Sequence, residues 1–235
     1  MEFNIGYFKQ SLKMAIQYAP VTIKLTVITF IVSLFLGTII ASIRHYKIPV
    51  LSQFFALFVT IYMGLPTMVA LVIYNLVFMM GYADFASFFH IKKSISEIDP
   101  IVIAYFTLIL GVGCHCSEIT RGAFRGVENV QYEAGDSIGM TKMQTLCRII
   151  LPQMIPIMIP GLVNNLIGTL KLSNLASTIG VMEVMVAALE PCGETYSYLE
   201  GYVAAALVYW IIGAGIEWVS KKVEQYSSRF RKQLT

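Results

Sequence analysis

The sequence predicts an all-α polytopic membrane protein with about five spans, and its composition and apolar runs support that prediction. The 235 residues are 57% hydrophobic and only 13% charged, whereas soluble domains carry about 25% charged residues. Several apolar runs reach the roughly 20 residues that a helix needs to cross a hydrocarbon core. Helices of that length satisfy their own backbone polar groups within lipid, which favours helices over a barrel. One membrane domain over 21–219 is therefore expected.

The first 20 residues are expected to form an amphipathic segment of their own. Apolar and polar side chains are interleaved there in a helical pattern, which indicates a short helix at the membrane interface. A frayed start of the first span is the alternative. The first span follows over 21–43 and exceeds the roughly 7–15 apolar residues of a signal peptide, so it is expected to be retained. Within it, Gly37 is a small residue suited to close helix contact.

The second span is expected over about 54–80, after a short basic turn. Proline removes a backbone donor and clashes with the preceding turn, so Pro66 is expected to kink this helix beside Gly64. A kink at membrane depth is tolerated where protein or a cavity satisfies the freed carbonyls. Gly64 and Pro66 are therefore candidate residues of a substrate pathway. A packing kink without a substrate role is the alternative.

The third span is expected from about 101 to 116, after a loop over 81–100 that has no basic excess. The span continues as a charged helix. Because Glu118 and Arg121 stand three residues apart, they share a face of that helix, where a local ion pair is the default interpretation.

A polar segment over about 127–152 then interrupts the apolar runs. It is expected to form two short amphipathic helices separated near Gly135 and Gly139. The fourth span begins after Pro152 and reaches Lys171, and prolines interrupt it more than any other apolar segment.

The last span, over about 202–219, lies between an acidic loop at 182–200 and a basic tail at 220–235. Eleven of the 17 lysines and arginines fall in the first turn, around the central polar segment and in the tail, which places these three regions in the cytoplasm. Five spans then put the amino terminus outside and the carboxyl terminus inside.

The central polar segment resembles the EAA loop of ABC importer permeases, which reads E-A-A, then glycine, then I-x-L-P. Glu133, Ala134 and Gly135 stand at the E-A-A positions. Gly139 matches the later glycine, and the stretch ending at Pro152 matches I-x-L-P. By this resemblance, these residues form the ATPase-coupling site of a type I ABC importer permease.

Four further stretches resemble motifs of the polar amino acid permeases, the histidine, glutamine, arginine and glutamate type. These motifs are A-E-I-x-R-G at 117–122, K-D-T-S-L at 171–175, I-G-V-x-E at 179–183 and R-G-T-P-L from residue 63. Two charges of the family pattern are missing, because Leu172 replaces its Asp and Met63 replaces its Arg. The resemblance therefore leaves the substrate open.

The resemblance implies a permease subunit in a prokaryotic cell membrane that imports a polar amino acid or a related compound such as cystine. The implied partners are two cytoplasmic ATPase subunits, a second permease chain of the same or a homologous kind, and an extracytoplasmic solute-binding protein. The chain has no G-x-x-x-x-G-K-[ST] loop, so we expect no enzymatic activity and no cofactor of its own, with ATP and Mg²⁺ on the partners. A net charge of +3 is too small to indicate nucleic acid as a partner beside the membrane lipid.

The coupling segment must present one face to the permease and another to a soluble motor. Gly135 and Gly139 permit a sharp turn and close approach of a partner backbone. Glu133, if it lies near a helix start, is favoured by the helix dipole and accepts hydrogen bonds from a partner. An ordinary solvated loop is the alternative.

Lys171 is the main candidate for substrate contact, because an ammonium near the centre of a span costs about 2.5–3.5 kcal/mol unless it is paired or hydrated. Facing the pathway, it would attract a carboxylate. An ion pair with Glu118 or Glu183, or a lysine that snorkels from a shorter span, is the alternative. The candidate pathway residues are Gly64, Pro66, Glu118, Asn164, Asn165, Lys171, Ser173 and Asn174.

Other function classes have weaker support. Cys114, His115 and Cys116 suggest a metal site, but helical residues two apart point away from each other and no second cluster completes four ligands. No spacing places Ser173 or Ser117 beside a histidine as a hydrolase requires. The competing functions are an ABC importer for another solute, and a passive channel whose loop docks a different partner.

Overall fold

The computed structural model describes residues 3–90 and 92–234, with side chains described up to residue 226, and this part of the chain contains helices but no strands. The longer helices are α1 (Ile5–His45), α2 (Leu51–Gly64), α3 (Thr67–Phe88), α4 (Ile101–Gly126), α7 (Leu151–Ser173) and α10 (Tyr198–Leu234). The shorter ones are α5 (Asn129–Ser137), α6 (Lys142–Thr145), α8 (Val184–Leu189) and α9 (Cys192–Thr195). The 3₁₀ turns η1 (Ile95–Glu97) and η3 (Asn174–Ile179) and the π-helical turn η2 (Leu146–Ile150) complete the set.

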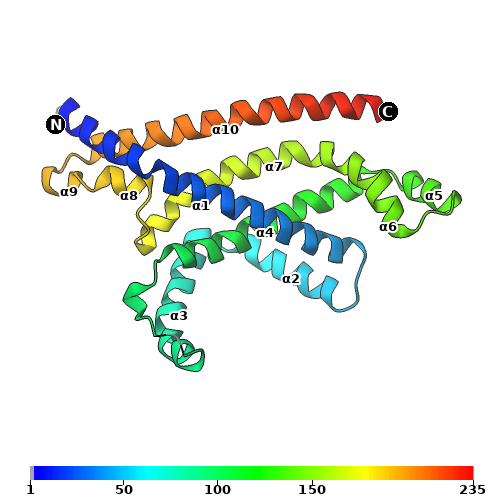
Figure 1. Cartoon of the computed structure of the whole chain (residues 1–235), viewed down its shortest axis with the longest axis horizontal. Coiled ribbons are helices and arrows are strands. Elements are labelled where there is room, and N and C mark those ends of the chain that lie inside the picture. Colours follow the sequence, from blue (N-terminus) through cyan, green and yellow to red (C-terminus); the bar gives the residue numbers. More distant parts are fainter. Residues whose placement is uncertain (1–2, 91, 235) are drawn as a thin grey trace.

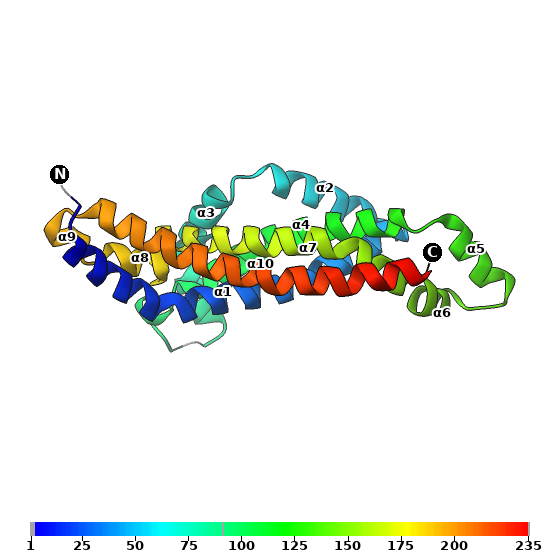
Figure 2. The same cartoon turned by 90° about the horizontal axis from the view of Figure 1, so that it is seen from above.

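Five stretches among the described residues are long and apolar enough to cross a membrane, which confirms the predicted number and order of spans. They comprise α1, α3, α4, the stretch from α6 to η3, and α10. Helices α1, α4, α7 and α10 run side by side along the long axis of the molecule (Figures 1 and 2). Helices α5 and α6 project beyond one end, while α9 and the start of α1 lie at the other.

Helices α1 and α4 cross in close contact at Gly37. A Cβ on Gly37 would lie 2.5 Å from Cys116 Cβ and 2.7 Å from the carbonyl oxygen of Gly113. The Ser33 hydroxyl donates a hydrogen bond of 3.0 Å to the Ile109 carbonyl across the same crossing. The predicted role of Gly37 in close helix contact is confirmed.

Helix α1 is longer than the sequence suggests. It is one helix of 41 residues that passes through Pro20, so no boundary separates an amino-terminal segment from the first span. Tertiary packing explains the continuity, since Ala15 is buried in a cluster with Val184 of α8 and Val208 of α10. The interfacial location of the first turns stays a prediction.

The predicted kink in the second span is a complete break. Leu65 adopts an extended conformation, α2 ends at Gly64, and α3 restarts at Thr67. The residue before a proline is sterically disfavoured in the helical conformation. Pro66 therefore keeps Leu65 out of the helix, and α2 ends at Gly64. At 14 residues, α2 is too short to cross a membrane by itself.

The acidic loop and the basic tail are both more structured than predicted. The loop folds into α8 and α9, and the tail continues α10 as a single helix. Glu183 is fully buried, where its carboxylate accepts hydrogen bonds from Thr22 Oγ1 at 3.2 Å, Met185 N at 2.8 Å and the Tyr209 hydroxyl. This carboxylate caps α8 and joins it to α1 and α10.

Candidate functional site

The coupling segment is a hairpin of short helices at one end of the bundle (Figure 2). Gly135 of α5 is buried against α6, and a Cβ there would lie 2.5 Å from Thr145 Oγ1. Gly139 has a φ of +72°, the left-handed conformation that glycine adopts without steric cost. Thr141 caps α6 by accepting a hydrogen bond from Gln144 N at 3.3 Å. The two glycines therefore allow the tight turn and close packing that the sequence predicts.

The side chains of Glu133 and Ala134 are exposed on α5 and available to a partner. Glu133 is in the middle of α5 rather than near its start, so the expectation that the helix dipole favours it is wrong. The reason is that α5 begins at Asn129, further upstream than the motif suggests. Pro152 is the second residue of α7 and follows the π-helical turn η2 directly, within one uninterrupted helical stretch from α6 to η3.

Exposed apolar side chains on the hairpin are a feature that the motif search missed. Val130 is 61% exposed, Ile138 71% and Met143 67%. Apolar residues on a projecting helical hairpin mark a surface suited to protein contact. These residues are not part of the E-A-A, G and I-x-L-P pattern, but the spacing of apolar residues along the segment could have identified them.

A small cavity of about 150 Å³ lies beside the break between α2 and α3. Pro66 lines it together with Met63, Leu172 and His115. Two of these are the positions at which the chain departs from the charges of the family motifs, and the fold brings them together. His115, considered from the sequence only for metal binding or hydrolysis, contributes an exposed imidazole to the cavity.

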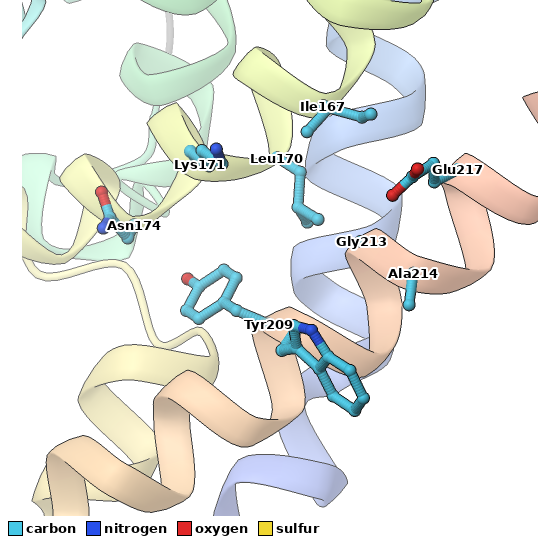
Figure 3. Close-up of a pocket in the computed structure, with 9 residues that line it drawn as sticks. Ile167, Leu170, Lys171, Asn174, Tyr209, Gly213, Ala214 and Glu217 are labelled. Atoms are coloured by element: carbon cyan, nitrogen blue, oxygen red, sulfur yellow. The ribbon is translucent and has the colours of Figure 1, made fainter.

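A second groove of about 450 Å³ separates α7 from α10 (Figure 3). Lys171 and Asn174 line it from one side, and Tyr209 points its hydroxyl towards α7 from the other. Glu217, further along α10, also lines the groove and forms an ion pair with Lys221 at 2.8 Å. In the described part of the chain, Lys171 forms no ion pair, so the alternative of a structural pair with Glu118 or Glu183 is wrong.

The other candidate pathway residues lie outside both cavities. Asn165 donates a hydrogen bond of 3.2 Å to Cys116 Sγ, and buried Ser173 donates one of 2.7 Å to the Leu170 carbonyl. Asn164 and Gly64 are exposed. Glu118 forms the ion pair with Arg121 that their three-residue spacing predicts, and it also pairs with Arg44 of α1.

The five spans and the projecting hairpin agree with the class that the sequence motifs imply, a permease subunit of an ABC importer. The pattern of the family described as binding-protein-dependent transport system inner membrane component matches residues 33–226. The chain belongs to this family.

Curated relatives cover nearly the whole chain. The probable amino-acid permease protein YxeN of Bacillus subtilis is 36% identical over 90% of this chain and 88% of its own length. The probable amino-acid ABC transporter permease protein PatM of Vibrio harveyi is 31% identical over 89% of this chain and 90% of its own. The L-cystine transport system permease protein TcyB of Bacillus subtilis is 34% identical over 89% of this chain and 84% of its own length.

A solved structure described as an amino acid ABC transporter with histidines has the same fold, with a TM-score of 0.81. Its identity is 22%, and the match covers 96% of this chain and all of that one. The protein is thus a multi-pass inner-membrane permease subunit, and ATP hydrolysis takes place on separate ATPase subunits.

Proposed function

We propose that this permease carries a polar amino acid, or a related compound such as cystine, and that ATPase subunits drive it through the hairpin over 127–152. The hairpin is the observation that supports the coupling role, since Gly135 lets it pack tightly, Gly139 permits its turn, and its apolar side chains remain uncovered. Relatives named as amino-acid and L-cystine permeases support the substrate class. ATP and Mg²⁺ bind the ATPases, and this chain needs no cofactor.

The complete transporter that we propose contains two permease chains, two ATPases and a solute-binding protein. Alternating access would then arise as closure of the ATPases moves the hairpins and rocks the spans. Within each permease, substrate would pass the cavity at the α2–α3 break, with Lys171 attracting its carboxylate from the neighbouring groove.

The first test purifies the tagged chain from its own membranes in mild detergent and assays it for ATP hydrolysis and transport. We expect an ATP-hydrolysing subunit to co-purify, and unlabelled polar amino acids or cystine to compete for uptake in reconstituted vesicles. If no ATPase is retained in several detergents and ions pass without ATP, the chain is a passive channel. Competition only by solutes of another class would refute the proposed substrate.

The cavity at the α2–α3 break makes a specific prediction for substrate charge. The variant Leu172→Asp places a carboxylate in this confined cavity. The arginine of the family motif is absent beside it, because Met63 stands at that position. An opposite charge strengthens binding of a cation at short range, so we expect the KM for arginine relative to that of a neutral amino acid to fall about tenfold, or roughly 1.4 kcal/mol.

Leu172→Asn is the matched control, because it has nearly the same size and polarity without the charge. It should leave the ratio of KM values close to that of the unmodified chain. Equal ratios in the Asp and Asn variants would show that this cavity does not contact the transported substrate.

A further inference from the structure

The hairpin is attached to the carboxyl end of α1 by an aromatic stack. His45 is the last residue of α1, and its ring stacks on the Phe124 ring of α4 with the two centroids 4.2 Å apart. The ring-edge nitrogen His45 Nε2 is 3.4 Å from the Tyr132 hydroxyl of α5. Burial raises the pKa of Tyr132, so this hydroxyl stays protonated at neutral pH.

Tyr132 is the residue of α5 that packs against the hydrophobic cluster at this junction. It lies against a buried cluster that includes Phe124, Ile150 and Met154. Its neighbours Glu133 and Ala134 are exposed. A displacement of α5 by a docked partner would therefore reach the bundle through the Tyr132 ring, beside the hydrogen bond of 3.2 Å that Gln153 of α7 donates to Gln131 of α5.

An ion cluster fixes α1 to α4 beside the stack. Glu118 Oε1 accepts a hydrogen bond from Arg44 of α1, and Glu118 Oε2 accepts two from Arg121 of α4. The Arg44 side chain is only 10% exposed. Because removal of one partner from a partly buried pair leaves an uncompensated charge, this cluster resists separation of the two helix ends.

Helix α1 also contacts the opposite end of the molecule. There, Thr22 donates to the buried Glu183 carboxylate that caps α8, and Thr22 Oγ1 accepts a hydrogen bond of 3.2 Å from Val184 N. One continuous helix thus joins the hairpin junction to α8. A helix held at its carboxyl end and again near its middle, at Thr22, transmits a displacement between these two points.

We propose that Tyr132 and His45 form the contact through which movement of the hairpin reaches α1, and through α1 reaches α4 and α8. They are positioning residues for coupling and touch neither nucleotide nor substrate. This inference rests on the proposed function, because it assumes that ATPases dock on the hairpin.

The test uses the complete reconstituted transporter with Tyr132→Ala, His45→Ala and the double variant. For each we measure the ATPase retained on purification, the rate of ATP hydrolysis and the number of substrates transported per ATP. We expect normal retention of the ATPase in all three variants, and about a tenfold fall in substrates per ATP. Because the two residues act in one path, the double variant should fall no further than either single one.

Tyr132→Phe is the conservative variant. It keeps the ring and loses a hydroxyl contact that at 3.4 Å is longer than a strong hydrogen bond, so it should restore most of the transport per ATP. Tyr226→Ala is the matched control, since it removes an aromatic residue that is 78% exposed on α10. It should behave as the unmodified chain.

The outcomes separate this inference from the proposed function. Failure of the unmodified chain to retain any ATPase refutes the proposed function itself. Normal ATPase retention with normal transport per ATP in Tyr132→Ala and His45→Ala refutes the coupling contact alone. Loss of ATPase retention in these variants would make Tyr132 a docking residue and also refute the inference. If the alanine variants fail to fold, Tyr132→Leu decides the matter, because it keeps an apolar side chain in the cluster and loses the ring: normal transport per ATP in this variant refutes the coupling contact.

Discussion

Replacement of Gly135 by leucine is expected to reduce ATP-driven uptake at least tenfold while the chain still inserts in the membrane. The smallest side chain there would already meet Thr145 Oγ1 at 2.5 Å and Thr145 Cγ2 at 2.7 Å. The α5–α6 hairpin would have to open to admit a leucine, which displaces the docking surface that Ile138 and Met143 form. Substrate uptake and substrate-stimulated ATP hydrolysis in vesicles measure the effect.

Gly122→Leu is the matched control for this change, because a Cβ at that helical position of α4 meets nothing within 4 Å. It should leave coupled uptake close to normal. Uptake and ATP coupling that persist in Gly135→Leu at normal expression would show that the hairpin does not couple the ATPase.

Gly139 allows a second test of the hairpin that depends on backbone conformation rather than space. Its φ is +72° and a Cβ there would meet no atom within 4 Å, so replacement by valine costs about 1–2 kcal/mol through left-handed strain alone. Asparagine tolerates this conformation much better. We therefore expect uptake to fall in Gly139→Val and to remain largely intact in Gly139→Asn, whereas equal uptake would mean that the turn is not required.

Gly37→Val is expected to destabilise the whole bundle rather than coupling alone. Its new Cβ would lie 2.7 Å from both the Gly113 carbonyl oxygen and the Ser117 nitrogen, and these backbone atoms cannot rotate away. Overpacking of this kind costs about 1–3 kcal/mol. The expected result is a lower yield in the membrane and a lower unfolding temperature in detergent.

Gly168→Ala is the control for the stability measurement, because a Cβ there meets nothing within 4 Å. Alanine also has a better helix propensity than glycine, so this variant should be as stable as the unmodified chain or slightly more stable. An unfolding temperature of Gly37→Val equal to that of the control would contradict the tight crossing of α1 and α4.

The candidate site was predictable to different degrees at its two locations. The hairpin could be predicted because Gly135 and Gly139 act through local packing and local backbone conformation. The cavity proposed for substrate could not be assembled from spacing, since Met63, His115 and Leu172 come from three separate helical regions and meet only in the folded chain. Asn165 and Ser173 hydrogen-bond within the bundle, and their role in the pathway stays a prediction.

The sequence by itself determined the class of the protein, the five spans and the hairpin with its turn, because hydropathy, proline and glycine act over a few neighbouring residues. Only the tertiary structure decided that α1 continues through Pro20, that Glu183 is buried and that Tyr132 reaches His45. The physical reason is separation along the chain. Thr22 and Glu183 are 161 residues apart and His45 and Tyr132 are 87 apart, so their contacts exist only once the helices have packed.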